Sequence, residues 1–435
     1  MGRGFVDAVM GLGLTTGPLH AVLIDAAVVA LVVLILLRRD RAWWSRMVPI
    51  ALAVTAVLLV VSSVWVDAVK SWPDALPVGV WAWTAAGELA VVLAVVGWRH
   101  RTWRLQVLTV GAVVLTLVGA ADGIDTEYDA YPTVGTALQL PPTDSTASLA
   151  HEASTAPGAT VPLWAWHSPA NVPAHGAVFP AAIPPMTSHF AARGAWVYVP
   201  PAYLVAGHPR LPVMVLLGGQ PGSPRDWLDG GRLAERMDAW AAAHGGLAPV
   251  VVMPDVLGRV FANPLCMDSA LGRVDIYLSS DVVSWVAGHL DVATDPQGWA
   301  VGGFSSGGTC ALQLATAHPQ LFPTFFDASG QQGPTLGNRR KTIAATFHGN
   351  TAAFVAVSPL QELAQHRYPA SAGYLAVGSN DPIYGPQQEV VARAARASGM
   401  TIVDVHLAGG HSFRVWGPAF SAALPWLSSR LGLTP

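Results

Sequence analysis

Four apolar segments fill most of the first 121 residues and constrain the fold more than any other feature of the chain. They cover residues 18–37, 47–66, 78–98 and 105–121. A helix needs about 20 apolar residues to cross a bilayer, with about 17 as the lower limit. One cleaved signal peptide cannot account for several such segments in series. The sequence therefore predicts a four-helix transmembrane domain over residues 1–121.

The short loops between these segments predict the orientation of the domain. Arginines collect after the first segment and after the third, at Arg38, Arg39, Arg41, Arg46, Arg99, Arg101 and Arg104. Lys70 in the second loop is offset by Asp67 and Asp74, and the next basic residue after the fourth segment is Arg193. Because cytoplasmic loops collect Lys and Arg, we expect a multi-pass plasma-membrane protein with both termini outside.

Two acidic residues interrupt the apolar segments, Asp25 in the first and Glu88 in the third. A carboxylate inside a membrane is costly and points to a function. The plainer alternative is a protonated acid that bonds a neighbouring hydroxyl such as Ser62, Ser63 or Thr84.

Bulk composition excludes some functional classes. Hydrophobic residues make up 52% and charged residues 12%, with a formal net charge of −3. No long basic run is present, so a nucleic-acid partner has no electrostatic basis. The histidines lack metal-ligand spacing, and two cysteines are too few for a disulfide scaffold or a four-cysteine zinc site.

The composition changes twice after the membrane domain. Residues 122–174 are rich in Pro, Thr, Ser and Ala and predict an extended linker. From 175 to 435, short β-rich runs alternate with helical stretches, which predicts a mostly parallel sheet with helices on both faces. The expected strands are 195–199, 213–217, 250–253, 299–301, 324–327, 373–377 and 401–406, and the expected helices include 231–244, 279–289, 308–318 and 387–398.

A GxSxG pentapeptide at 303–307 marks Ser305 as the candidate nucleophile. An apolar run at 299–301 precedes it and a helical stretch follows, as the strand, sharp turn and helix of a nucleophile elbow require. The turn places the hydroxyl near a helix N-terminus, whose dipole favours negative charge.

A serine hydroxyl needs a base and an orienting acid. In the α/β-hydrolase order along the chain, the nucleophile comes first, then the acid, then the base. His411, which follows two glycines just past the last expected strand, is the candidate base. His406, inside that strand, is a weaker rival. Asp381 follows the strand at 373–377 and is the favoured acid. Glu389 on the next helix is the alternative.

Two backbone N–H groups must form the oxyanion hole. One is expected from Ser306, the residue after the nucleophile. The other is expected from the Gly-rich loop at 218–222, where Pro221 has no N–H and Gln220 or Gly219 is the donor.

These motifs resemble the esterase D and mycolyltransferase group of α/β-hydrolases. The similar pieces occur in the same order at 197–201 (VYVPP), 211–222 (LPVMVLLGGQPG), 250–255 (VVVMPD), 302–308 (GGFSSGG), 317–322 and 411–416 (HSFRVW). The resemblance implies acyl-ester chemistry through an acyl-serine, without metal or organic cofactor. It places Ser305, Asp381 or Glu389, and His411 in the triad, and Gln220 and Ser306 in the oxyanion hole.

The chain departs from that group at two positions. The group usually has His-Gly or Asp-Gly where this chain has Gly218-Gly219, which puts trehalose as acceptor in doubt. Ser306 replaces the usual Met or Ala after the nucleophile, where only the N–H is expected to act.

The two cysteines, Cys266 and Cys310, are expected near the rim of the active site. An outward orientation would place them in an oxidising compartment. We expect the two cysteines either to form a disulfide with each other or to remain as two buried free thiols.

The leading function is a membrane-anchored, extracytoplasmic serine esterase or acyltransferase that acts on lipid or glycolipid esters of the cell envelope. One alternative is a catalytically inactive hydrolase domain that binds or assembles envelope components. Another is a transport-like role of the membrane domain, which Asp25 and Glu88 alone support.

Overall fold

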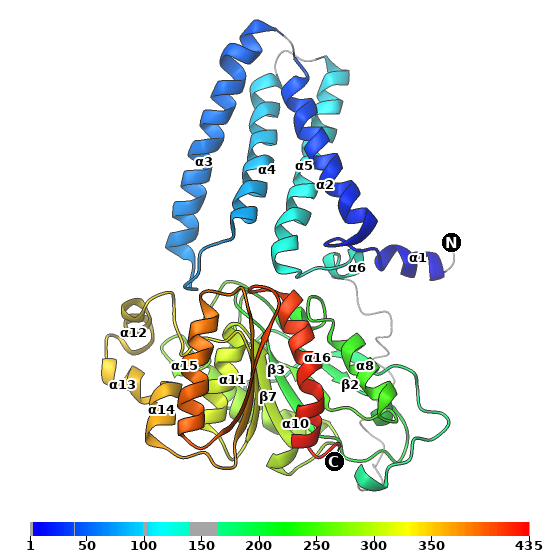
Figure 1. The fold of residues 1–435 in the computed structure, drawn as a ribbon, viewed down its shortest axis with the longest axis vertical. Coiled ribbons are helices and arrows are strands. Elements are labelled where there is room, and N and C mark those ends of the chain that lie inside the picture. Colours follow the sequence, from blue (N-terminus) through cyan, green and yellow to red (C-terminus); the bar gives the residue numbers. More distant parts are fainter. Residues whose placement is uncertain (1–2, 39, 99–101, 140–162, 435) are drawn as a thin grey trace. The chain divides into compact units, whose positions relative to one another are not determined.

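The computed structural model describes residues 3–38, 40–98, 102–139 and 163–434. It divides into two compact units, one of residues 1–70 and 74–140 and one of residues 71–73 and 141–435 (Figure 1). Each unit is described by itself.

The first unit contains four long apolar helices, as predicted. They are α2 (Gly17–Leu36), α3 (Val48–Val69, after a π-helical turn at Trp43–Met47), α4 (Val78–Gly97) and α5 (Trp103–Tyr128). All four are long and apolar enough to cross a membrane. Small residues allow close packing: a Cβ on Gly119 of α5 would lie 2.3 Å from the Cβ of Ala27 on α2.

The fourth helix is longer than predicted, and the predicted start of the linker at 122 is wrong. The helix continues to Tyr128, and a short helix α6 (Val134–Ala137) follows; another, α1 (Arg3–Met10), precedes α2. The polar residues that ended the apolar run find partners within the fold. Asp122 pairs with His20 at 2.7 Å, and Asp125 accepts the backbone N–H of Ala130 at 3.0 Å. Of the predicted linker, residues 140–162 lie outside the described residues.

The two acidic residues within the apolar helices differ in their surroundings. The hydroxyl of Ser62 donates to Oε1 of Glu88 at 3.2 Å, so the hydroxyl contact of the plainer alternative is present. Asp25 is exposed on the surface of α2.

The second unit is built on an eight-stranded sheet in the order β1-β2-β4-β3-β7-β8-β9-β10. Neighbours from β4 to β10 run parallel, whereas β2 is antiparallel to both β1 and β4. The strands are β1 (Ala177–Ala181), β2 (Ala195–Val199), β3 (Val213–Leu217), β4 (Val250–Met253), β7 (Trp299–Phe304), β8 (Thr324–Ala328), β9 (Ala372–Gly378) and β10 (Thr401–Leu407). All seven predicted strands are present, and the edge strand β1 was not predicted.

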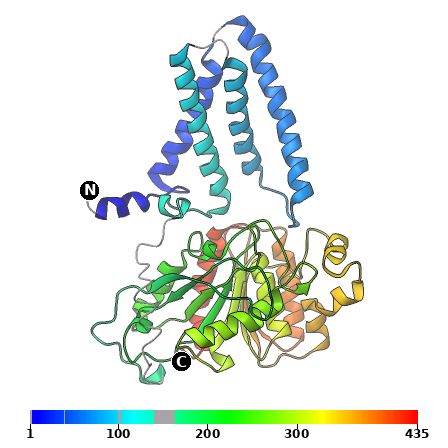
Figure 2. The same ribbon diagram turned by 180° about the vertical axis from the view of Figure 1, so that it is seen from behind.

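Helices cover both faces of this sheet, as predicted (Figures 1 and 2). Helix α11 packs against β7 and β8 and contacts α14, which in turn contacts α15. Helix α16 packs against β8 and β9 and contacts α8. The central strands are buried on both faces, as parallel strands between two helical layers must be. The helices are α8 (Leu233–Ala243), α9 (Val274–Ile276), a π-helical turn (Tyr277–Val282), α10 (Val283–His289), α11 (Ser306–Ala317), α12 (Arg339–Phe347), α13 (Thr351–Ala356), α14 (Pro359–Gln365), α15 (Tyr384–Ala397) and α16 (Phe413–Arg430), with a small hairpin of β5 (Asp268–Ser269) and β6 (Gly272–Arg273).

Candidate active site

Ser305 stands at the sharp turn between β7 and α11, as predicted. Its backbone has φ 54° and ψ −123°, a conformation that costs a non-glycine residue energy and clusters at active sites. The flanking glycines allow the turn: a Cβ on Gly303 would lie 2.2 Å from the carbonyl carbon of Gly307, and one on Gly307 would lie 2.3 Å from the oxygen of Leu217. Ser305 therefore caps the N-terminus of α11, next to the first N–H groups of that helix.

The three residues predicted as a triad lie in one hydrogen-bonded chain. Ser305 Oγ is 2.9 Å from His411 Nε2, and His411 Nδ1 is 3.0 Å from Asp381 Oδ2. The other carboxylate oxygen of Asp381 accepts the N–H of Tyr384 at 3.0 Å. A carboxylate only accepts, so Nδ1 of His411 donates to it, which leaves Nε2 free to accept the serine proton.

Aromatic residues fix the imidazole ring of His411. Tyr384 stacks on it with ring centroids 3.8 Å apart, and Trp416 meets it edge-on at 4.9 Å. Tyr384 was not predicted from the sequence, although its place three residues after Asp381 was a usable signal. The ring is held between two surfaces and can reorient little.

The rival residues lie away from the triad. His406 is exposed on β10. Glu389 projects from α15 toward solvent, with its carboxylate 3.6 Å from Arg393. Within the described part of the chain, His411 makes its carboxylate contact with Asp381.

The Gly-rich loop after β3 runs beside the nucleophile. A Cβ on Gly219 would lie 3.4 Å from the Cβ of Ser305, so the backbone at Gly219 passes close to the nucleophile. Ser306 begins α11, where an N–H has no acceptor inside the helix. Gly219 and Ser306 thus lie next to Ser305, and Gln220 as an oxyanion donor stays a prediction.

An ion pair that was not predicted from the sequence anchors this loop. Arg193 contacts both carboxylate oxygens of Asp255, at 2.7 and 3.0 Å, and also donates to the carbonyl of Gly222 at 2.9 Å. Burial opposes the ionisation of Asp255, but the hydrogen bonds and charge of Arg193 outweigh it and lower the pKa of that carboxyl. The Arg193–Asp255 pair therefore ties the Gly218–Gly222 loop to the loop after β4.

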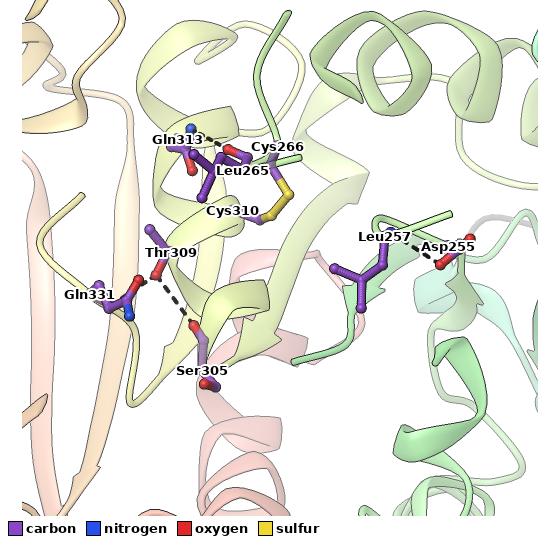
Figure 3. Close-up of a disulfide and its surroundings, with 9 residues drawn as sticks. All are labelled: Asp255, Leu257, Leu265, Cys266, Ser305, Thr309, Cys310, Gln313 and Gln331. Carbon is purple, nitrogen blue, oxygen red and sulfur yellow. Dashed lines mark hydrogen bonds between the residues drawn. A yellow bond between two sulfur atoms is a disulfide. The ribbon is translucent and has the colours of Figure 1, made fainter. Parts of the chain in front are cut away.

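The two cysteines form a disulfide, which decides between the two expected states. It joins Cys266, in the loop after β4, to Cys310 on α11, with Cα atoms 5.5 Å apart (Figure 3). It also lines a pocket that contains Ser306 and Thr309. The residues described give no group of three or more His, Cys, Asp or Glu side chains placed to hold a metal ion.

Asp327 is a second carboxyl beneath the nucleophile elbow. It lies one residue before the end of β8, is buried, and accepts the N–H of Gly330 at 2.8 Å. It leaves no space for a side chain at 308, since a Cβ on Gly308 would lie 2.1 Å from its Oδ1. Burial raises the pKa of Asp327 to about 7, and the Gly330 hydrogen bond offsets only part of that rise.

The raised pKa of Asp327 predicts that the protein loses stability as pH rises from about 4 to about 7. The folded state keeps the proton to about pH 7, whereas the unfolded chain releases it near 3.8. Between these values the unfolded state binds fewer protons, so the free energy of unfolding falls as pH rises. The full difference corresponds to about 4 kcal/mol. We expect the melting temperature of Asp327→Asn to fall much less between pH 5 and pH 8 than the melting temperature of the wild type. Tryptophan-fluorescence melts of the detergent-solubilised chain would measure both.

The exposed Glu389→Gln is the matched control for that experiment and should follow the wild-type melting curve at both pH values. A loss of stability in Asp327→Asn that parallels wild type would contradict the assignment of this pH dependence to Asp327.

Comparison with known proteins identifies the family. A family model described as "Putative esterase" matches residues 191–427. An uncharacterized protein of Corynebacterium glutamicum is 36% identical over 400 residues, which cover 88% of this chain and 89% of the relative. Because so much of this chain is covered, the similarity extends beyond the second unit into the apolar helices.

Two solved structures share the fold of the second unit. A ferulic acid esterase is 18% identical with a TM-score of 0.50, over 59% of this chain and 98% of that one. An S-formylglutathione hydrolase from Agrobacterium tumefaciens is 18% identical with a TM-score of 0.50, over 60% of this chain and 98% of that one. At this identity they show the α/β-hydrolase fold alone. Together with the family match, they confirm the resemblance to esterases: the chain belongs to this esterase family of the α/β-hydrolase fold, with four apolar helices before the hydrolase unit.

Proposed function

We propose that the protein is a membrane-anchored, extracytoplasmic serine esterase or acyltransferase that works through an acyl-serine. The observation that carries this proposal is the hydrogen-bonded chain from Ser305 through His411 to Asp381. An inactive hydrolase domain would have no need to keep a serine in a costly backbone conformation within hydrogen-bonding distance of an oriented imidazole.

The proposed reaction has two halves. His411 Nε2 takes the proton of Ser305 while Oγ bonds the ester carbonyl carbon, and the oxyanion accepts from the N–H groups of Ser306 and Gln220. His411 then protonates the leaving alcohol, and the acyl-serine remains. Water or a second alcohol, deprotonated by the same imidazole, bonds the acyl carbon. The bond to Ser305 Oγ then breaks, the imidazolium returns the proton to Oγ, and the carboxylic acid or new ester leaves. Asp381 stabilises the imidazolium in both halves.

The proposed substrate is a lipid or glycolipid ester of the cell envelope, as for a mycolyltransferase-like enzyme. The four apolar helices support the membrane part, because tethering raises the effective concentration of a catalytic domain near its substrate. The arginine-rich loops support an outward orientation of the catalytic domain.

A membrane-impermeant fluorophosphonate tests both the chemistry and the location. We expect it to label the wild-type chain on intact cells and to leave Ser305→Ala unlabelled. Ser329→Ala is the matched control, because Ser329 is a fully buried serine that makes no contact with His411 in the described structure, and it should label like wild type.

The outcomes separate the two parts of the proposal. Labelling only after lysis would overturn the extracytoplasmic location while leaving the serine chemistry in place. Absence of labelling in the folded wild type, intact or lysed, would overturn the enzymatic proposal and favour the inactive binding protein.

A further inference from the structure

A groove lies between helices α8 and α16 of the second unit, which contact each other (Figure 1). It has a volume of about 520 Å³, within the usual range for small-molecule sites, and it is open to solvent. Among the described residues that line it, none belongs to the triad of Ser305, His411 and Asp381. A ligand in this groove would therefore not occupy the proposed active site.

The side chain of Arg236, on α8, is held at the wall of this groove by groups from both sides. Its Nε donates to the carbonyl of Gly231 at 2.8 Å, and its Nη1 donates to Oγ of Ser421 on α16 at 2.8 Å. The guanidinium lies directly on the backbone of α16, because a Cβ on Gly417 would come within 2.6 Å of Nη2. The positive charge is therefore fixed in one place along the groove.

Arg236 is half-buried and has no acidic partner among the described residues. Its two hydrogen bonds go to a carbonyl and a hydroxyl, while Glu235 beside it pairs with Arg232. Burial and the charge of Arg232 lower the pKa of Arg236, and Glu235 offsets only part of this effect. Arginine is rarely buried unless it is paired. The groove thus lacks the negative charge that would balance this guanidinium.

Arg232 provides a second positive charge in the groove, at the N-cap of α8. Its guanidinium pairs with Glu235, but both side chains are more than half exposed, at 51% and 66%. Such a surface ion pair contributes little to stability, so Arg232 can turn toward a ligand. Two guanidinium groups suit a phosphate, which carries up to two negative charges and which arginine binds in a bidentate geometry.

The rest of the groove offers an aromatic and apolar surface. The imidazole of His244 stacks on the indole of Trp240 with ring centroids 3.8 Å apart, and its Nδ1 donates to the carbonyl of Trp240 at 2.8 Å. The groove is also lined by Ala239, Ala243 and Leu424. The organic part of a phosphate ester can pack against these side chains while its phosphate meets the arginines.

We propose that the groove between α8 and α16 binds a phosphate ester through Arg236 and Arg232. The phosphate belongs either to a soluble molecule or to a lipid headgroup, since both present the same charged oxygens. This binding site is separate from the triad and does not depend on the proposed esterase reaction.

The test uses the full chain in detergent, with glycerol 3-phosphate in isothermal titration calorimetry and phosphatidylglycerol in native mass spectrometry. We expect one or both to bind, with a single molecule per chain. Arg236→Gln should weaken this binding by about tenfold or more, because it removes hydrogen bonds between charged groups. Arg232→Gln, an exposed substitution that leaves the fold intact, should weaken it by about threefold. Gly417→Ala should also weaken it, since the added Cβ displaces the guanidinium without removing its charge.

Arg393→Gln is the matched control, because Arg393 is an exposed arginine that pairs with Glu389 on its own helix and does not line the groove. Arg393→Gln and Ser305→Ala should both bind like the wild type. Binding of glycerol 3-phosphate alone would identify a soluble ligand, and retention of phosphatidylglycerol alone would identify a lipid headgroup; each supports the proposal.

Three results would overturn it. The first is a folded wild type that binds neither probe. The second is binding that persists unchanged in Arg236→Gln and Arg232→Gln, or that is lost in Ser305→Ala, since the ligand would then lie elsewhere. The third is an equal affinity for glycerate, the carboxylate counterpart of glycerol 3-phosphate, which would exclude a site that selects phosphate.

Discussion

Replacing His411 by alanine is expected to lower kcat for ester hydrolysis by about 10⁵- to 10⁶-fold, since loss of the base costs about as much as loss of the whole triad. The reason is geometric. His411 Nε2 lies 2.9 Å from Ser305 Oγ, and without it the hydroxyl keeps its proton. KM should change little, because the imidazole acts mainly in the transition state. Stopped-flow or long-time assays with p-nitrophenyl esters would measure both constants.

His406→Ala provides the matched control, since His406 is exposed on β10, five residues earlier. It should retain kcat within about twofold, as surface substitutions usually perturb little. Similar losses in both variants would point to a general structural effect and contradict the assignment of His411 as the base.

Replacing Asp381 by asparagine is expected to lower kcat about 10⁴-fold, or about 5 kcal/mol of transition-state stabilisation. Oδ1 of asparagine can still accept the N–H of Tyr384, which Asp381 Oδ1 accepts at 3.0 Å. The amide NH₂ would then face Nδ1 of His411 and force that nitrogen to accept. Nε2 would carry the proton and could not take another from Ser305. The loss should appear in kcat at every pH at which the wild type is active.

Glu389→Gln is the matched control for the acid. Its carboxylate lies 3.6 Å from Arg393 on the same helix and points away from the triad. Activity should stay near wild type. The reverse pattern, an active Asp381→Asn and an inactive Glu389→Gln, would mean that the acid is Glu389 and that the hydrogen bond to His411 has been misassigned.

Local sequence patterns were enough for the features that depend on neighbouring residues. Apolar length predicted four helices, and each predicted strand lies within an observed one, because a strand buried on both faces must be continuously apolar. The GxSxG motif predicted the turn at Ser305, since only glycine fits where a Cβ on Gly303 would touch Gly307. The end of α5 was misjudged because Asp122 and Asp125 are polar but find partners within the fold.

Features that join distant residues needed the tertiary structure. The sequence left Asp381 and Glu389 both open, and only the path of the chain after β9 brings Asp381 within 3.0 Å of His411. The same holds for the bond between Cys266 and Cys310, which are 44 residues apart in sequence. Only the tertiary structure shows that the hydroxyl of Ser306 is buried without a hydrogen-bond partner among the described residues. Periodicity and spacing report what a residue's near neighbours impose, whereas a hydrogen bond across the sheet depends on how crossovers and loops place both partners in space.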